Sequence, residues 1–310
     1  MQALVLSNGA VALEQVERPK PGPGEVLLRV ACAGLCRTDQ YVAQGLLPSE
    51  SPRILGHECS GIVYRLGEGV DQQHLGARVA VFPWIGCGLC DYCLDDREKL
   101  RYLCPERKFL GWQVDGCFAE FLCVPMDRCI PLSDDISFQA GAYLEPVMAA
   151  LAILRAPLKD AANKAILGKN RISQLTSALL TEMGKHPHEI VTEGDAPDNT
   201  FDLVIETSAT ESSLTDAMRI LRPDGLLVLK SRPPENIAWP VRLQVEKEIN
   251  TMALGYGTTK MALMLLQRRG HLFEDIWHQP VPLAQWEDAF QENDTEQESR
   301  KIFFLPSGRL

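Results

Sequence analysis

The sequence predicts a two-part α/β protein, in which a barrel-like region of antiparallel strands precedes a parallel sheet covered by helices. Before residue 130, short β-branched and aromatic runs alternate with Gly/Pro turns, as where residues 19–24 precede the strand-like run 25–30. After Asp134, strand-like runs alternate with segments of helical spacing, which is typical of a parallel sheet with both faces covered. The two parts also differ in chemistry, because all ten cysteines lie before residue 130.

The individual elements follow from the same patterns. In the first part we expect strands over 25–30, 61–64 and 77–82. In the second part we expect strands over 164–168, 201–206 and 226–229, and helices over 138–154, 172–183, 214–221 and 258–269. A final strand over 301–305 could return to the first part. We therefore expect one domain formed by residues 1–150 and 280–310, and a second formed by residues 151–279.

Composition and charge exclude several classes of partner. The 310-residue chain carries 31 basic and 41 acidic residues, a formal net charge of −10. This balance lacks the cationic surface that nucleic-acid binding requires, so we expect no nucleic-acid partner. The longest apolar stretch, roughly 147–154, is far shorter than the ~20 residues that span a bilayer, so we expect no membrane partner. The chain opens without the basic segment of a secretion signal, and we expect a cytoplasmic protein.

Four cysteines have the spacing of a structural metal site. Two Cys-x-x-Cys steps connect Cys87, Cys90 and Cys93, and Cys104 follows. Tight turns at this spacing direct three thiolates to one point, and the fourth thiolate closes a tetrahedral zinc shell with no open position. Such a site stabilises structure and performs no chemistry. Buried or redox-active cysteines are the alternative, but clustered cysteines in a cytosolic chain more often bind metal.

Three polar clusters suggest a second metal site. Cys36 follows a strand, His57 and Glu58 precede a strand, and Glu145 begins an apolar helix. Each cluster alone is a weak signal, but together they offer a thiolate, an imidazole and a carboxylate. Three such ligands, with a fourth position left for water or substrate, make up a catalytic zinc site. Another divalent metal is also compatible with these donors.

Several motifs occur together in one order: residues 34–39, 56–58, the four-cysteine lobe, residues 115–120, and 145–146. On these motifs the chain resembles the zinc-containing medium-chain dehydrogenase/reductase superfamily, which includes alcohol, sorbitol and threonine dehydrogenases. The resemblance implies a GroES-like β-barrel catalytic domain, a Rossmann-type domain, two Zn²⁺ ions per chain, and a homo-oligomer that is a dimer or a tetramer. It covers nearly the whole chain and is most specific before residue 150. The gap between Cys93 and Cys104 is longer than is usual in the family, which enlarges one loop.

The resemblance also implies roles for individual residues. By position, three residues would hold the catalytic zinc: Cys36, His57 and Glu145. Glu58 would enter as a transient ligand, and Thr38 would pass a proton between the oxygen at the zinc and solvent. Asp39 would orient His57 from outside the coordination shell. The zinc would then act as a Lewis acid on a small hydroxyl- or carbonyl-bearing substrate.

The expected nucleotide-binding turn departs from the family pattern. A Rossmann domain needs glycines where the first strand turns into its helix, so that the turn is tight and the backbone approaches the pyrophosphate. Here the turn, residues 168–173, keeps only Gly168, and Asn170 places a side chain where the phosphates should approach. Lys169 and Arg171 remain as candidates to bind dinucleotide phosphates in an unusual pose, together with Gly168.

The second domain is also short. Only 16 residues, 185–200, precede the strand over 201–206, where family members place a strand ending in an acidic residue, a helix and a further strand. One βαβ unit takes ~30 residues or more, so we expect a shortened Rossmann-type sheet lacking one strand and one helix. The remaining segment, 185–193, resembles the third strand of the family and not the second. Glu193 would then lie on the wrong strand for a ribose, which argues against ordinary NAD(P) use.

Three functions remain open. A redox-neutral zinc enzyme of lyase or isomerase type, with a small-molecule substrate in the vacated nucleotide site, is slightly favoured because the adenosine half of the pocket is missing. A conventional NAD(P)-dependent alcohol or polyol dehydrogenase is the first alternative. A non-catalytic scaffold stabilised by zinc is the second, and the complete set of catalytic residues argues against it.

Overall fold

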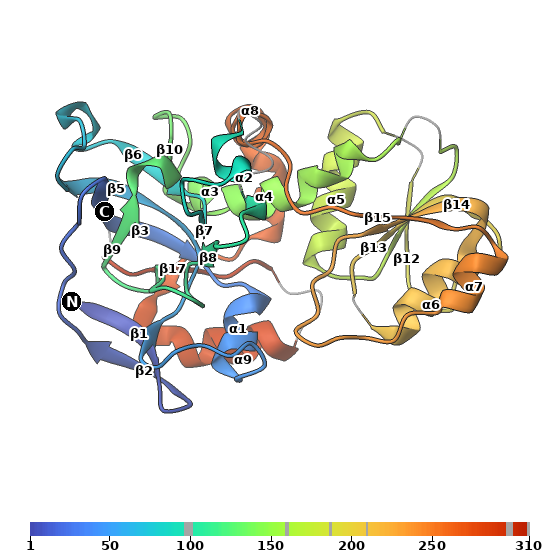
Figure 1. Ribbon diagram of the computed structural model, residues 1–310, viewed down its shortest axis with the longest axis horizontal. Coiled ribbons are helices and arrows are strands. Elements are labelled where there is room, and N and C mark those ends of the chain that lie inside the picture. Colours follow the sequence, from blue (N-terminus) through green and yellow to red (C-terminus); the bar gives the residue numbers. More distant parts are fainter. Residues whose placement is uncertain (96–101, 159–160, 186–187, 209, 296–299, 309–310) are drawn as a thin grey trace. The chain divides into compact units, whose positions relative to one another are not determined.

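The computed structural model describes residues 1–95, 102–158, 161–185, 188–208, 210–295 and 300–308 (Figure 1). The chain divides into two compact units. The first unit contains Met1–Pro146 and the described C-terminal residues from Ala262 onward, and the second contains Val147–Met261.

The central strand of the first unit is β3 (Glu25–Gly34). One edge of β3 pairs antiparallel with β5 (Glu58–Leu66) along most of its length. The other edge is shared, because β9 (Phe121–Pro125) pairs with residues 25–29 and β17 (Phe303–Leu305) pairs with residues 33–34. The last strand of the chain therefore returns to the first part, as the sequence predicts.

The remaining strands of this unit extend the barrel-like arrangement. The seven-stranded sheet has the order β10-β6-β5-β3-β17-β16 with β9 on β3, and its remaining strands are β10 (Cys129–Pro131), β6 (Arg78–Val81) and β16 (Val281–Pro282). A second sheet contains β2 (Ala10–Gln15), β1 (Gln2–Ser7) and β4 (Arg53–Ile54), and a short ribbon contains β7 (Trp84–Ile85) and β8 (Lys108–Phe109). Four helices belong to the described part of the unit: α1 (Arg37–Ala43), α2 (Asp91–Leu94), α3 (Phe138–Ala142) and α9 (Trp286–Thr295).

The helix predicted over 138–154 is two helices. α3 ends at Ala142, α4 (Leu144–Leu151) follows, and a 3₁₀ turn covers Ala152–Arg155. Pro146 explains the break, because it has no N–H to donate to the carbonyl of Ala142 and so cannot continue α3.

The boundary of the first unit differs from the predicted one. Residues 262–279 were expected in the second domain but belong to the first unit. An aromatic cluster explains this, since the ring of Tyr143 lies 5.9 Å from Phe273 and 5.3 Å from Trp277, and Trp277 lies 5.7 Å from Phe303. Clustered aromatic rings bury much apolar area, so they hold this C-terminal segment against β17.

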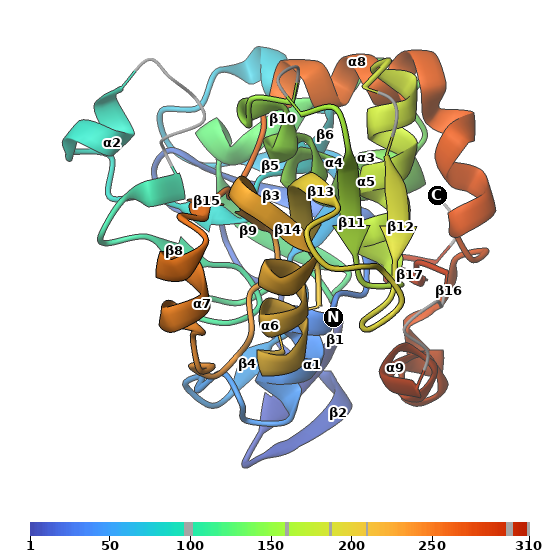
Figure 2. The same ribbon diagram turned by 90° about the vertical axis from the view of Figure 1, so that its right-hand side faces the viewer.

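The second unit is a five-stranded parallel sheet. Its order is β12-β11-β13-β14-β15, and Figure 2 shows the strands side by side in this order. The strands are β12 (Glu189–Val191), β11 (Lys164–Leu167), β13 (Phe201–Glu206), β14 (Leu221–Leu229) and β15 (Asn250–Ala253). The helices are α5 (Arg171–Glu182), α6 (Glu211–Ile220) and α7 (Val241–Glu246), and α8 (Thr259–Arg269) crosses the boundary between the units.

Both faces of this sheet are covered, as the alternating pattern predicts. Ile166 and Ile205 share one cluster with Leu180 of α5. Leu167 and Val204 belong to another cluster, with Ala217 and Met218 of α6. Because neighbouring residues of a strand point to opposite faces, the two clusters lie on the two sides of the sheet.

The sheet confirms the shortened Rossmann-type domain but corrects the identity of one strand. A six-stranded domain has the order 3-2-1-4-5-6, and here a single strand lies beyond β11 on that side. β12 pairs directly with β11, through Ala165 to Leu167, so it occupies the place of the second strand and not the third. The edge of β11 needs backbone partners, and the nearest following strand supplies them.

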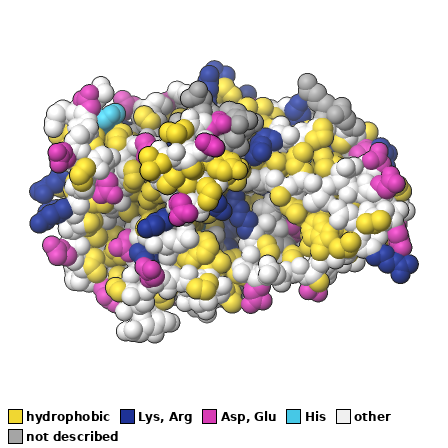
Figure 3. Space-filling model, in the orientation of Figure 1, with side chains coloured by type: hydrophobic (Ala, Val, Ile, Leu, Met, Phe, Trp, Pro, Cys, Tyr) yellow, Lys and Arg dark blue, Asp and Glu magenta, His cyan; other side chains and the backbone are white. Residues whose placement is uncertain are grey.

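Two surface properties bear on partners. Among the described residues, no helix combines the length and the apolar character needed to cross a membrane. On the face shown in Figure 3, Lys and Arg side chains are interspersed with Asp and Glu.

Candidate active site and structural metal site

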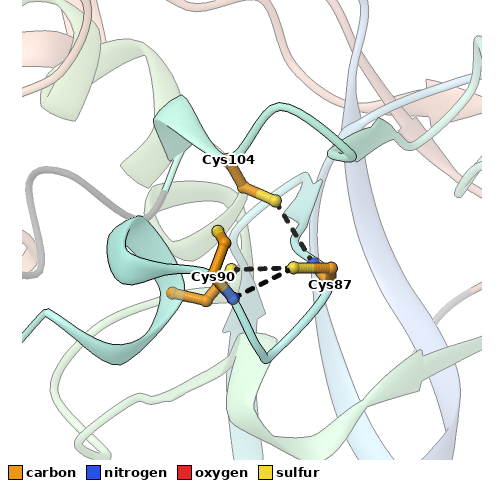
Figure 4. A group of neighbouring side chains, drawn as sticks. Cys87, Cys90 and Cys104 are labelled. Carbon is orange, nitrogen blue, oxygen red and sulfur yellow. Dashed lines mark hydrogen bonds between the residues drawn. The ribbon is translucent and has the colours of Figure 1, made fainter.

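The four-cysteine lobe brings its thiols together. The Sγ atoms of Cys87, Cys90, Cys93 and Cys104 all lie within 4.8 Å of one another, and Figure 4 shows three of the side chains converging. The Sγ atoms of Cys87 and Cys93 are 4.0 Å apart. Zinc–sulfur bonds of about 2.3 Å give a tetrahedral edge of about 3.8 Å, which is close to the spacing of Cys87 and Cys93, so the donor set fits a zinc ion.

Backbone amides stabilise the thiolate form of one cysteine in this lobe. The N–H groups of Leu89 and Cys90 each donate to Cys87 Sγ at 3.4 Å, and these bonds lower the pKa of Cys87 to about 6. Burial raises the pKa of Cys93 to about 11. A metal ion is therefore the natural counter-charge for the remaining thiolates, because it stabilises the deprotonated form of each ligand.

The second cluster forms where β3 ends and β5 begins. Gly34 at the end of β3 pairs with Glu58 at the start of β5, which places Cys36 and His57 at the same end of the ladder. Among the described residues, the metal-ligand atoms of Cys36, His57 and Glu58 lie within 4.8 Å of one another. The structure thus brings together a thiolate, an imidazole and a carboxylate that lie apart in sequence.

Asp39 orients two members of this cluster. Its Oδ1 lies 2.9 Å from Nδ1 of His57, and its Oδ2 accepts a hydrogen bond from the backbone N–H of Cys36 at 2.8 Å. Burial lowers the pKa of His57, but the negative charge of Asp39, its hydrogen bond and Cys36 outweigh burial, so the pKa of metal-free His57 lies well above 6.5. The Asp39 contact leaves Nε2 of His57 as the nitrogen available to a metal.

Thr38 lies at the edge of the cluster. Its Oγ1 is 3.9 Å from Cys36 Sγ and its side chain is half-buried, so it connects the cluster with solvent. The Phe109 ring lies 4.7 Å from His57, and the Trp84 ring packs on Phe109 at 4.4 Å. The sequence analysis did not single out Phe109, whose only signal was its position beyond the cysteine lobe.

Lys301 is the second residue that the sequence analysis missed. Its Nζ lies 2.7 Å from Oε1 and 2.6 Å from Oε2 of Glu58, and both side chains are buried. The pairing of β17 with β3 and a bridge between Lys301 and Trp277 bring Lys301 to this site. The Glu58 carboxylate is buried against the Lys301 ammonium, and one of its oxygens joins the Cys36 thiol and the His57 imidazole in a set of three possible metal ligands. The donor set therefore fits a zinc ion.

Glu145 takes a more distant position than predicted. It lies buried in the first turn of α4 and is not among the three clustered residues of the described chain. Burial raises the pKa of Glu58 and the charge of Glu145 adds to that rise, whereas Lys301 and His57 oppose it. The role of Glu145 as third zinc ligand therefore stays a prediction.

In the second unit, the turn after β11 keeps one glycine, and Asn170 at its end caps the start of α5. Gly168 has φ +111°, and a Cβ there would lie 2.7 Å from Thr207 Oγ1. Asn170 caps α5, since its Oδ1 accepts from the N–H groups of Ile172 and Ser173 at 2.9 and 3.1 Å. These are amides that a phosphate would otherwise use at a helix N-terminus. Lys169 and Arg171 flank this cap, and their predicted contacts with phosphates stay a prediction.

Glu193 follows β12, which is the direct neighbour of β11 and not the third strand that the sequence analysis expected. Because β12 is the direct neighbour of β11, Glu193 follows the strand that carries the ribose-binding acid in a Rossmann domain. A pocket of about 510 Å³ opens here, lined by Glu193, Gly194, Glu211, Ser212, Thr215, Asp216 and Arg219.

Comparison with known proteins supports the sequence motifs. Residues 22–134 match the family model of the alcohol dehydrogenase GroES-like domain. The chain is 29% identical over 288 residues to an alcohol dehydrogenase of Geobacillus stearothermophilus, covering 80% of this chain and 82% of that protein. It is 29% identical over 272 residues to a sorbitol dehydrogenase of Bacillus subtilis, covering 76% of each.

The fold is similar to that of a solved dehydrogenase. A protein of Sinorhizobium meliloti described as a zinc-binding dehydrogenase, crystallised with NADP, aligns with a TM-score of 0.85 and 24% identity over 98% of this chain and 99% of that one. These relatives give no support to the redox-neutral chemistry that the sequence slightly favoured, because they are named as dehydrogenases. The order of the motifs, the GroES-like match and the shortened parallel sheet show that this chain belongs to the medium-chain dehydrogenase/reductase superfamily of zinc enzymes.

Proposed function

We propose that this protein is a zinc-dependent dehydrogenase that interconverts a small alcohol or polyol and its carbonyl product with a nicotinamide dinucleotide. The observation that carries the proposal is the buried cluster of Cys36, His57 and Glu58, with Asp39 bonded to His57 and Thr38 at its rim. The relatives named alcohol and sorbitol dehydrogenase support the same reaction class.

The residues around the Cys36 cluster have different roles in the proposed reaction. When bound, zinc polarises the substrate oxygen and the nicotinamide carries the hydride. Asp39 holds His57 in the tautomer that presents Nε2. Thr38, half-buried beside Cys36, exchanges the hydroxyl proton with solvent. Phe109 and Trp84 form an apolar wall beside His57 that keeps water from the reacting atoms.

The second unit supplies the dinucleotide contacts. Glu193 accepts hydrogen bonds from the adenosine ribose hydroxyls, and Lys169 and Arg171 bind the phosphates at the Gly168 turn. Glu211 in the same pocket adds negative charge that repels a 2′-phosphate, and Arg219 there is already paired with Asp216 and Asp198, so NAD is preferred over NADP. Each chain holds two zinc ions, one in the four-cysteine lobe and one at the Cys36 cluster.

The first experiment is calorimetric titration of zinc-loaded protein with NAD⁺, NADH, NADP⁺ and NADPH, followed by a screen of alcohols and polyols for stoichiometric NADH formation. We expect micromolar binding of NAD⁺ and NADH and weaker binding of the phosphorylated pair. No heat and no thermal shift with any of the four would exclude hydride transfer. Cys36→Ala should abolish turnover and leave dinucleotide binding unchanged, whereas Cys123→Ser, a half-buried thiol outside both clusters, should preserve both.

A further inference from the structure

A cavity of about 320 Å³ lies in the first unit and belongs to neither metal site. Its lining comes mostly from β1, β4 and β9 and from residues that follow β2. None of the lining residues is a member of the Cys36 cluster or of the four-cysteine lobe. The volume falls within the range of about 300–1,000 Å³ that is typical of small-molecule sites.

Small side chains leave this space open. Ala3 of β1 forms a bridge with Ala119, and both are fully buried in a small hydrophobic cluster that is separate from the main core of the unit. Val16 and Ile54 pack against this cluster and line the cavity, but they are only partly buried. A ligand that covers these apolar side chains therefore gains free energy from their burial.

Arg53 contributes an unused hydrogen-bond donor to the lining. Its side chain is buried, and its Nη1 lies 3.1 Å from Oδ1 of Asp115. Its Nη2 has only a 3.5 Å contact with Glu50, whose side chain is 93% exposed. Its Nε is also buried, and it has no hydrogen-bond partner among the described residues. A buried N–H without a partner is unfavourable, so an acceptor on a ligand would satisfy it.

The charges of the lining favour a neutral acceptor over an anion. Three charged side chains line the cavity, one positive (Arg53) and two negative (Glu17 and Asp115). Asp115 already balances the charge of Arg53 through their ion pair. A carboxylate on the ligand would face the second acid, Glu17, and like charges placed together weaken binding. A carbonyl oxygen accepts from Nε of Arg53 without adding charge.

We propose that this cavity binds a small, neutral, largely apolar molecule whose carbonyl oxygen accepts a hydrogen bond from Nε of Arg53. The apolar part of the ligand packs on Ile54 of β4 and on Phe121 and Leu122 of β9. This site goes beyond the proposed dehydrogenase reaction, and it requires neither the zinc ions nor the dinucleotide.

The first test compares three probes with zinc-loaded full-length protein by ligand-observed NMR titration. Methyl benzoate has an apolar ring and an ester carbonyl, propylbenzene has a similar size and no acceptor, and benzoate carries a carboxylate. We expect methyl benzoate to bind at least about 10-fold more tightly than either of the others, the scale of a hydrogen bond to a charged group. Equal affinity for propylbenzene would mean that Arg53 makes no hydrogen bond to the ligand. Tighter binding of benzoate would mean that the site takes an anion. Either result would overturn the proposal.

A half-buried thiol reports where the probe binds. Cys123 lines the cavity, and burial raises its pKa to about 11, so we expect slow alkylation by iodoacetamide. Methyl benzoate should slow this alkylation further, as followed by mass spectrometry of the peptide that contains Cys123. Cys129, a buried thiol outside the lining, is the reference and should keep its rate. No change at Cys123, or an equal change at both thiols, would contradict binding in this cavity.

Two variants separate the donor from the space. Arg53→Met keeps most of the side-chain volume and removes the N–H groups, so methyl benzoate should bind at least about 10-fold more weakly. Arg65→Met, at an exposed position of β5, is the matched control and should leave the affinity unchanged. Val16→Phe fills the cavity without touching the Arg53 ion pair, so it tests the site even if Arg53→Met fails to fold. Unchanged affinity in Val16→Phe would overturn the proposal.

Discussion

Nδ1 of His57 lies 2.9 Å from Oδ1 of Asp39, and both side chains are buried between the end of β3 and the start of β5. The same carboxylate accepts the N–H of Cys36, so a single residue places the thiolate and the imidazole together.

Replacement of Asp39 by Asn should therefore weaken zinc binding at this cluster. The amide can present its N–H₂ group to His57 and favour the wrong tautomer, and loss of such partners costs about 10–100-fold in metal affinity. Chelator competition measures the change, and Asp134→Asn at an exposed side chain is the matched control. An unchanged zinc affinity in Asp39→Asn would show that Asp39 does not orient the ligand.

The protonation of His57 should make stability and metal binding respond to pH in opposite directions. In the metal-free protein the pKa of His57 is raised above its unfolded value of about 6.5. The His57–Asp39 ion pair therefore stabilises the fold fully below that unfolded value, and this contribution is lost as pH rises through the folded pKa. Zinc requires neutral His57, so zinc affinity should rise over the same interval. Denaturant unfolding of metal-free protein and zinc titrations across pH test both trends, and parallel trends would contradict the assignment.

Loss of one thiolate from the lobe should remove the structural zinc and leave the other site occupied. Cys104 is fully buried at the centre of the group, so Cys104→Ser should reduce metal content from about two ions per chain to about one and lower the thermal midpoint. Elemental analysis after dialysis measures the stoichiometry. Cys123→Ser should keep both ions. Retention of both ions in Cys104→Ser would contradict a four-thiolate site.

Replacement of Asn170 by Gly should strengthen dinucleotide binding. The substitution removes the side chain that occupies the amides of Ile172 and Ser173, and its loss as a cap costs the helix only a few tenths of a kcal/mol because glycine is an acceptable N-cap. It also removes two hydrogen bonds that Asn170 Nδ2 donates to Thr207, so the thermal midpoint should fall somewhat. NADH titration calorimetry is the measurement, with Ser177→Ala on the same helix as control. Unchanged affinity would mean that the diphosphate does not approach this helix end.

Replacement of Glu193 by Gln should reduce the preference for NAD⁺ over NADP⁺. A hydrogen bond to a charged group contributes about 1.5–3 kcal/mol, so NAD⁺ affinity should fall by about 10–100-fold while NADP⁺ affinity changes less. Glu189→Gln, on the same strand at an exposed position, is the control. Equal losses for both dinucleotides would indicate that Glu193 does not distinguish the 2′ position.

The two metal sites differ in how far the sequence could predict them. Cys87, Cys90 and Cys93 lie within one loop, where local turns determine which atoms converge, so their spacing was sufficient. The Cys36 cluster came from three separate segments, and the family resemblance was needed to join them. Its metal-ligand atoms in the structure include Glu58 and not Glu145, because strand pairing at Gly34 decides which carboxylate faces the thiolate.

For the second unit, chain length predicted the number of strands but not their order. The count of residues between 185 and 200 correctly predicted a shortened sheet, since chain length limits the elements that fit. The same count could not say which neighbour β11 would take, and the loss of the adenosine pocket that was inferred from it stays a prediction. Pairing of β12 with β11 is a long-range choice between sheet edges, and it places Glu193 two residues beyond the strand next to β11.

The sequence by itself determined the α/β class, the four-cysteine lobe and the order of the catalytic motifs, because each depends on local spacing or on chain length. Only the tertiary structure decided the neighbour of β11, the capping of α5 by Asn170 and the contact between Lys301 and Glu58. Those last two residues are separated by 243 positions, and no local pattern records their contact. They meet because β17 takes the free edge of β3 beside Gly34, and backbone hydrogen bonding of that edge is satisfied only once the whole unit has folded.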